Sequence, residues 1–223
     1  SKMATNVIPL RESQVKLVID GKQHLGIHIA HANNSHAAKQ FKEDTKNQGL
    51  IIKDKEITGW DTQGLIEHDG EIYLYGPFFE GRTVDEALLS EPKNALSYVH
   101  QLVRSLVTIK ERSQSLPRFQ ANGILFLDDG GLLFFPPALM QRIRATQIES
   151  DRLRTYERYN NPDLEGEESL SFSLAVLCYR LFTGVDPFPA DNEEDIHNRM
   201  REHQPAAPQL LVPEIKKGVS DDV

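Results

Sequence analysis

The sequence has a single cysteine, no long apolar run and no block of positive charge. Because Cys178 is alone among the 223 residues, the chain cannot form an internal disulfide. The chain lacks both a run of about 18 apolar residues and an N-terminal signal pattern, so we expect neither membrane insertion nor export. The net charge of −8 excludes a general binder of nucleic acid or anionic membranes, since both require a basic surface. These absences predict a cytoplasmic protein.

What the chain contains is ordinary for a globular protein. Apolar residues make up 39% of the sequence and charged residues 26%. Its length is enough for one domain of two lobes, or for two small domains, with a sizeable core. A helix-start signal at Ser220 lies just before the end, which predicts that the natural protein continues beyond residue 223.

The first part of the chain has the alternating pattern of β-strands. Residues 15–19 and 25–30 predict two strands joined by a tight turn at Asp20-Gly21, and further short β-like runs lie between residues 50 and 75. Residues 35–48 are polar with a sparse apolar stripe, which predicts one helix. The first third is therefore expected to be a small sheet with one helix.

From Thr83 onward the apolar period changes from about 2 to about 3.6 residues, which predicts helices. Thr83 is expected to cap a short helix, and residues 94–113 to form a long amphipathic one. Another helix is expected over 192–203, with Asn192 as its cap and acidic residues in its first turn.

Two segments between these helices differ from them. Residues 123–135 predict a hairpin with its turn at 128–131, and residues 136–168 predict a loop with one helical turn. A β-rich part followed by a helical part favours an α+β fold. We expect two lobes, residues 1–76 and residues 77–223.

The segment 173–184 is apolar nearly all round, which is typical of a helix buried in the middle of a domain. Gly184 and Pro187 are C-terminal stop signals, so the helix is expected to end at about residue 183. Cys178 lies within it and is expected to be a small buried hydrophobe.

Four phrases along the chain resemble segments of protein kinases. EIYLYGPFFEGRTVDEALL at 71–89 resembles a strand, hinge and first C-lobe helix, and ANGILFLDDGG at 121–131 resembles the hairpin after the catalytic loop. YNNPD at 159–163 resembles the phrase that closes the activation segment, and SLAVLCYRLFTGVDPF at 173–188 resembles the central C-lobe helix. The resemblance to the protein kinase-like superfamily implies a two-lobed α+β fold, with a reduced β-rich N-lobe and a mainly helical, truncated C-lobe.

The same resemblance places unsuitable residues where kinases carry their catalytic groups. The catalytic base position falls on Arg118, the magnesium-binding Asn position on Gly123, and the lysine position at or near His28. No glycine-rich phosphate loop is present in the sequence. The DFG position offers no carboxylate, because it falls on Pro136, Pro137 and Ala138.

Phosphoryl transfer depends on positioning and on charge neutralisation by metal ions, so the resemblance implies a pseudokinase without activity. We expect a protein-binding or regulatory module whose partner is another protein or another domain of the same chain. No cofactor and no ATP binding are expected. One alternative is an atypical phosphotransferase or nucleotidyl transferase that uses Arg118, Asn122, Asp128 and His28. Another is an α+β module of unrelated ancestry.

Four histidines, His24, His28, His31 and His36, lie within thirteen residues. Strand alternation places His24 and His28 on one face. A zinc site would normally add carboxylate or Cys ligands at a fixed spacing, and no such spacing appears in this stretch. Scattered polar strand positions are the favoured interpretation, and a metal site is the alternative.

The one locally basic stretch covers residues 142–158 and contains Arg142, Arg144, Arg152, Arg154 and Arg158. Guanidinium groups bind carboxylates and phosphates well, so this stretch is a candidate site for an acidic or phosphorylated partner segment. An ordinary solvated loop is the alternative.

Overall fold

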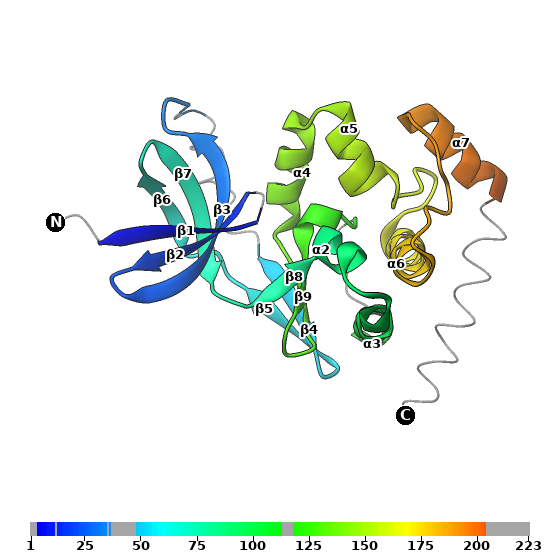
Figure 1. Cartoon of the computed structure of the whole chain (residues 1–223), viewed down its shortest axis with the longest axis horizontal. Helices are drawn as coiled ribbons and strands as arrows, with labels where there is room; N and C mark the ends of the chain where they lie inside the picture. Colours follow the sequence, from blue (N-terminus) through cyan, green and yellow to red (C-terminus); the bar gives the residue numbers. More distant parts are fainter. Residues whose placement is uncertain (1–3, 12, 35, 37–47, 113–117, 204–223) are drawn as a thin grey trace. The chain divides into compact units, whose positions relative to one another are not determined.

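The computed structural model describes residues 4–11, 13–34, 36, 48–112 and 118–203. It has the predicted α+β composition, with two antiparallel five-stranded sheets and a series of helices (Figure 1).

The chain forms two compact units. The first combines the described residues up to Leu50 with Gly59–Glu80 and Phe135–Ile143, and the second contains Ile51–Thr58, Gly81–Phe134 and the described residues from Arg144 onward. The expected lobes, 1–76 and 77–223, are continuous along the chain, whereas these units interleave.

The first sheet has the strand order β1-β2-β3-β7-β6. Its β2–β3 turn has Asp20 and Gly21 at positive φ (49° and 81°), and Asp69 and Gly70 repeat this geometry at 49° and 77°. Both central residues at positive φ are typical of the tight turns that Asp-Gly pairs favour, so the turn predicted at Asp20-Gly21 is confirmed. The strands are β1 (Thr5–Arg11), β2 (Gln14–Ile19), β3 (Lys22–His31), β6 (Gly64–His68) and β7 (Glu71–Pro77).

The second sheet contains the predicted hairpin. Its strand order is β5-β4-β10-β9-β8, and the β9–β10 turn is held by the amide of Gly131, which donates to the Asp129 carboxylate at 3.0 Å. The Lys53 ammonium group lies 3.0 Å from the same carboxylate. The strands are β4 (Gly49–Lys53), β5 (Glu56–Trp60), β8 (Gly81–Thr83), β9 (Ile124–Leu127) and β10 (Leu132–Phe134).

Two predicted helix caps are confirmed. Thr83 forms a capping box with Glu86 at the start of α2 (Val84–Leu89), and the Asn192 side chain accepts from the amide of Asp195 at 2.9 Å, beside the start of α7 (Glu193–His203). The amphipathic helix is α3 (Ala95–Arg112), preceded by the short η1 (Pro92–Asn94). The polar helix predicted over 35–48 lies outside the described residues except at His36 and Gln48.

The central helix is α6 (Gly166–Thr183), and it ends where the sequence predicts. Gly184 adopts the left-handed conformation at φ 69°, and its amide donates to the carbonyl of Arg180 at 2.8 Å. Cys178 is buried, as expected. Burial raises the pKa of its thiol to about 12.

The loop predicted over 136–168 is wrong, because most of this segment is helical. It forms α4 (Pro137–Thr146), α5 (Glu149–Arg152) and a turn of π-helix, η3 (Leu153–Glu157). These helices bury few apolar side chains, so the segment has only a weak apolar period, and contacts with distant residues add to their stability.

Among the described helices, none combines the length and apolar character needed to cross a bilayer.

Candidate functional site

A cluster of two histidines and a glutamate lies where β3 meets β7. The β3–β7 register pairs His28 with Tyr73, then Ala30 with Ile72 and His31 with Glu71, so one extra residue of β3 is inserted after His28. In a regular strand, residues three apart point to opposite faces. The bulge changes this parity and places His28, His31 and Glu71 on the same face.

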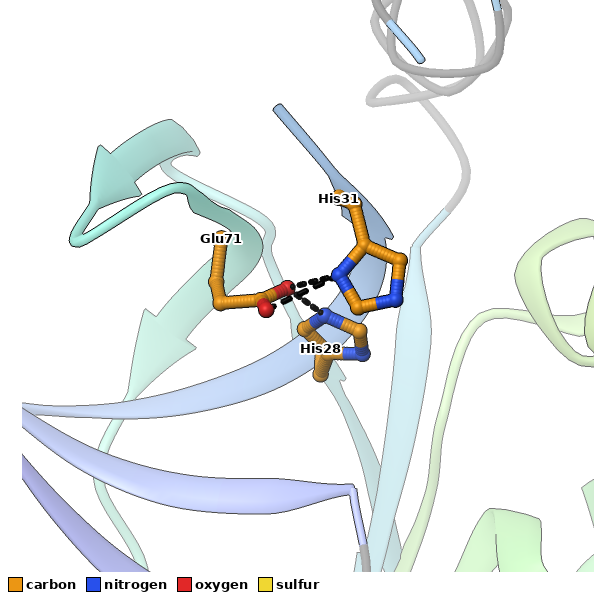
Figure 2. A group of neighbouring side chains, drawn as sticks. All are labelled: His28, His31 and Glu71. Carbon is orange, nitrogen blue, oxygen red and sulfur yellow. Dashed lines mark hydrogen bonds and ion pairs between the residues drawn. The ribbon is translucent and has the colours of Figure 1, made fainter. Parts of the chain in front are cut away.

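The three side chains are close enough to interact directly. The Nε2 atom of His28 lies 2.5 Å from Oε2 of Glu71, and Nδ1 of His31 lies 2.8 Å from the same carboxylate. Figure 2 shows both imidazole rings turned toward the carboxylate. An ionised carboxylate can only accept hydrogen bonds, so both ring nitrogens must carry a proton in this arrangement. The hydrogen bond from His28 lowers the pKa of Glu71. Desolvation raises this pKa, and the hydrogen bond from His31 lowers it further.

The cluster is accessible from solvent. The exposed fraction of the side chain is 33% for His28, 70% for His31 and 32% for Glu71. The ring of Tyr73 packs edge-on against His28, with 5.6 Å between the centroids. His28 and Glu71 are therefore partly buried, and the His31 side of the cluster is open to solvent.

His24 is not part of this cluster, although the register places it on the same face as His28. It is buried, and its Nδ1 atom lies 2.9 Å from Oε1 of Gln63. The structure thus confirms the shared face predicted for His24 and His28 but brings His31, not His24, to His28.

A second group of ionisable side chains surrounds Glu157. The Glu157 side chain is buried, and its two oxygens lie 3.0 Å from Nη2 of Arg144 and 2.9 Å from Nε2 of His197. Glu193 lies nearby. Because a guanidinium group already neutralises this carboxylate, we interpret the group as a buried ion pair that holds α7 against η3.

Arg118, which the sequence resemblance assigned to the catalytic base position, contacts backbone carbonyls. Its guanidinium donates to the carbonyl of Leu164 at 2.6 Å and to that of Asn161 at 3.4 Å. Gly123, which the resemblance assigned to the magnesium-binding position, ends the short η2 (Ala121–Gly123) and is buried. Neither residue presents an acidic group.

Asn160 was not predicted as a structural residue, although it lies in the YNNPD phrase, and it joins three segments near this position. Its side-chain amide donates to the carbonyls of Phe119 at 2.8 Å and Tyr156 at 2.9 Å, and its side-chain oxygen accepts from the hydroxyl of Ser173 at 3.2 Å. The side chain is buried. Asn160 therefore links the segment after Arg118 to η3 and to α6.

The residues that the resemblance assigned to the DFG position lie at the start of a helix. Pro136 is buried, Pro137 begins α4, and the carbonyl of Pro136 accepts from the amide of Met140 at 3.2 Å. Ala138 lies within the first turn. Proline at the first helical position is favourable because no amide donor is needed there.

The arginines of the predicted basic stretch interact within the chain. Arg144 pairs with Glu157 and lies 3.6 Å above the ring of Tyr156. Arg152 donates to the carbonyl of Gln147, Arg154 pairs with Asp85, and Arg158 pairs with Asp186. Arg142 also has an interaction within the chain. Partner binding by this stretch stays a prediction, and it would have to compete with these contacts.

Comparison of the sequence with protein-family models and with curated proteins gives no match.

Glu71 and Glu157 were missed as site residues because each lies about forty residues from the histidine that it contacts. Glu71 follows the Asp69-Gly70 turn and begins a predicted strand, which is a signal that it sits at the end of a sheet. Pairing β7 with β3 and including the bulge would have been needed to bring it to His28.

Proposed function

We propose that this chain is a catalytically inactive, kinase-like module that acts by binding a protein partner or by regulating another part of its own chain. A β-rich part followed by a helical part supports the proposal, as does the position of His28 on the third strand. Kinases carry their phosphate-binding lysine on the third strand and pair it with a helix glutamate. In this chain a histidine takes that place, and its partner Glu71 comes from β7.

The observation that carries the proposal is the role of Arg118. A catalytic base must be free to accept a proton from the substrate hydroxyl. The Arg118 guanidinium cannot accept a proton and is hydrogen-bonded to the carbonyls of Asn161 and Leu164. We infer that the segment at the catalytic-loop position now stabilises the fold.

The DFG position supports the same conclusion. Kinases hold magnesium on the nucleotide phosphates with an Asp at this position. Pro136, Pro137 and Ala138 have no side-chain oxygen, and Pro137 is already the first residue of α4. Nucleotide phosphates would therefore lack a metal clamp at this position.

Nucleotide binding can be tested by thermal unfolding with and without ATP and Mg²⁺. A ligand at about 100 times its Kd stabilises a protein by about 2.7 kcal/mol. For a chain of this size such a gain raises Tm by about 5–10 °C. We expect no change in Tm, and a rise that depends on both ATP and Mg²⁺ would refute the proposal.

Transfer of labelled phosphate or nucleotide from ATP tests the enzymatic alternative separately. We expect no transfer to the chain, to a generic protein substrate or to water. Transfer that disappears in Arg118→Ala or Asp128→Ala protein would support the alternative site and overturn the proposal.

A paired substitution tests the structural role of Arg118. We expect Arg118→Asp to lower stability without creating activity. It restores the acid of the kinase motif but removes the donor to the carbonyl of Leu164, whereas the carbonyl of Asn161 keeps the amide of Leu164. Arg118→Lys keeps a cationic donor and should be less destabilising. Equal Tm values for the wild type and Arg118→Asp would contradict the structural role.

A further inference from the structure

We propose that His28, His31 and Glu71 form a binding site for a divalent transition-metal ion, with Zn²⁺ as the ligand the donor set suits best. This inference does not depend on the proposed function, since it uses only side chains of β3 and β7. Zn²⁺ favours imidazole nitrogen and carboxylate oxygen, and two His with one Glu leave room for a water or a further ligand. The hard cations Mg²⁺ and Ca²⁺ favour sites made of oxygen alone.

The backbone positions the three ligands before any metal binds. His31 is the last residue of β3 and Glu71 the first of β7, and the two are directly paired in the register. His28 joins them because of the bulge, which is held by pairing with β7 before and after the extra residue, at His28–Tyr73 and Ala30–Ile72. A site on a paired sheet loses little backbone entropy on binding, because the strands are already ordered.

The ligand distances are compatible with a metal ion after small side-chain movements. Zinc bonds of about 2.0–2.1 Å in tetrahedral geometry separate neighbouring ligand atoms by about 3.3 Å. The ring nitrogens now lie 2.5 Å and 2.8 Å from the Glu71 oxygens, so each contact must lengthen by less than an ångström. The exposed His31 side chain can rotate to allow this, since 70% of its surface is accessible.

Metal binding would replace two hydrogen bonds by coordination bonds. His28 Nε2 and His31 Nδ1 now direct N–H groups at the carboxylate, and each nitrogen must lose that proton to bind a cation. In a neutral imidazole, the proton moves to the other ring nitrogen. The carboxylate coordinates through an oxygen and needs no change of tautomer.

The Glu157 group is a weaker candidate for the same chemistry. Its three possible ligands are Glu157, Glu193 and His197, but the Arg144 guanidinium occupies an oxygen of Glu157. A cation there would be repelled by the guanidinium. Among the described residues, Glu71 forms ion pairs with His28 and His31 and none with a Lys or Arg.

Isothermal titration of the full chain tests the site. The protein is prepared without a histidine tag, stripped with a chelator and titrated with ZnCl₂ at neutral pH, and with MgCl₂ for comparison. We expect one Zn²⁺ per chain and no Mg²⁺ binding. Loss of a ligand should weaken binding at least as much as loss of an outer-shell partner, which costs about 10–100-fold. We therefore expect a Kd at least about tenfold higher in His31→Ala and Glu71→Gln protein.

His100 provides a control away from this sheet. It lies on α3 and belongs to neither group of possible metal ligands. His100→Ala should leave Zn²⁺ affinity unchanged. Equal effects of His100→Ala and His31→Ala, or an absence of Zn²⁺ binding to the wild type, would overturn the proposal.

Nitrogen NMR of the histidine rings provides a second readout. On addition of Zn²⁺ we expect coordination shifts at Nε2 of His28 and Nδ1 of His31, with the other ring nitrogen protonated in each case. Because His31 is exposed, His31→Ala should fold normally and lose the His28 shift. Shifts confined to other histidines would refute this site even if Zn²⁺ binds.

Discussion

Replacing Asn160 by alanine should destabilise the protein strongly, because this buried side chain joins three segments. The 1% exposed residue makes hydrogen bonds to Phe119, Tyr156 and Ser173. A net hydrogen bond contributes about 1 kcal/mol, and a buried group left unpaired costs about 1–3 kcal/mol.

The three bonds do not count equally. The carbonyl of Tyr156 also accepts from the backbone amides of Tyr159 and Asn160, so it keeps other bonds. The single proton of the Ser173 hydroxyl can instead be donated to the carbonyl of Ser169, 3.0 Å away. The carbonyl of Phe119 accepts from the Asn160 side-chain amide. We expect a total loss of about 3 kcal/mol in the free energy of unfolding, most of it from the Phe119 carbonyl.

Denaturant unfolding followed by tryptophan fluorescence and circular dichroism measures this loss. For a chain of this size, a loss of about 3 kcal/mol lowers Tm by about 6–12 °C. Asn161→Ala is the matched control: Asn161 is equally buried, but its side-chain oxygen accepts one bond, from Asp163, and its amide nitrogen has no partner among the described residues. We expect a loss of about 1 kcal/mol there. An Asn160→Ala loss no larger than that of Asn161→Ala would refute the reasoning.

An Asn160→Asp variant tests the direction of the hydrogen bonds. A carboxylate would face the two carbonyl oxygens that now accept from Asn160, so the folded state should raise its pKa above the unfolded value of about 3.9. An acid whose pKa is higher in the folded than in the unfolded state binds its proton more tightly when folded. The folded state is therefore favoured at low pH. The stability deficit relative to the wild type should therefore grow as pH rises from acid to neutral, and a deficit independent of pH would contradict the assigned orientation.

Three further predictions follow from individual environments. Cys178 should react with thiol reagents only after unfolding, because burial raises its pKa to about 12 and so removes the reactive thiolate at neutral pH; rapid labelling of the native protein would contradict this. Gly76→Ala should lower Tm by a few degrees, at a cost of about 1–3 kcal/mol, since the added Cβ would lie 2.5 Å from the buried Trp60 ring, whereas an unstrained site would gain stability. Desolvation raises the pKa of Asp129, but hydrogen bonds from a backbone amide and from Lys53 outweigh this effect, and the net pKa is lowered. The carboxylate therefore stabilises the folded state above about pH 4, and this stabilisation is lost as pH falls through the folded pKa. Asp129→Asn should thus cost less than about 1 kcal/mol at neutral pH, as expected for a half-exposed pair, and nothing in strong acid, as measured by denaturant unfolding at each pH.

Several elements could be predicted because their signals are local. The Asp20-Gly21 turn, the Thr83 cap and the Gly184 stop each depend on the conformational preferences of one residue and its near neighbours. The segment around 137–157 was mispredicted as a loop because its helices bury few apolar side chains and contact residues far along the chain, such as Asp85.

The sequence by itself determined the composition class, the type of most elements, the burial of Cys178 and the unsuitable side chains at the positions where the resemblance expects catalysis. It supplied His28 and His31 but no reason to group them with Glu71. The tertiary structure decided that grouping, because strand register and a single bulge set which side chains share a face, and both arise from pairing between segments forty residues apart. It likewise decided that Arg118 and Asn160 bind backbone carbonyls, since those carbonyls are brought to them only when the chain packs.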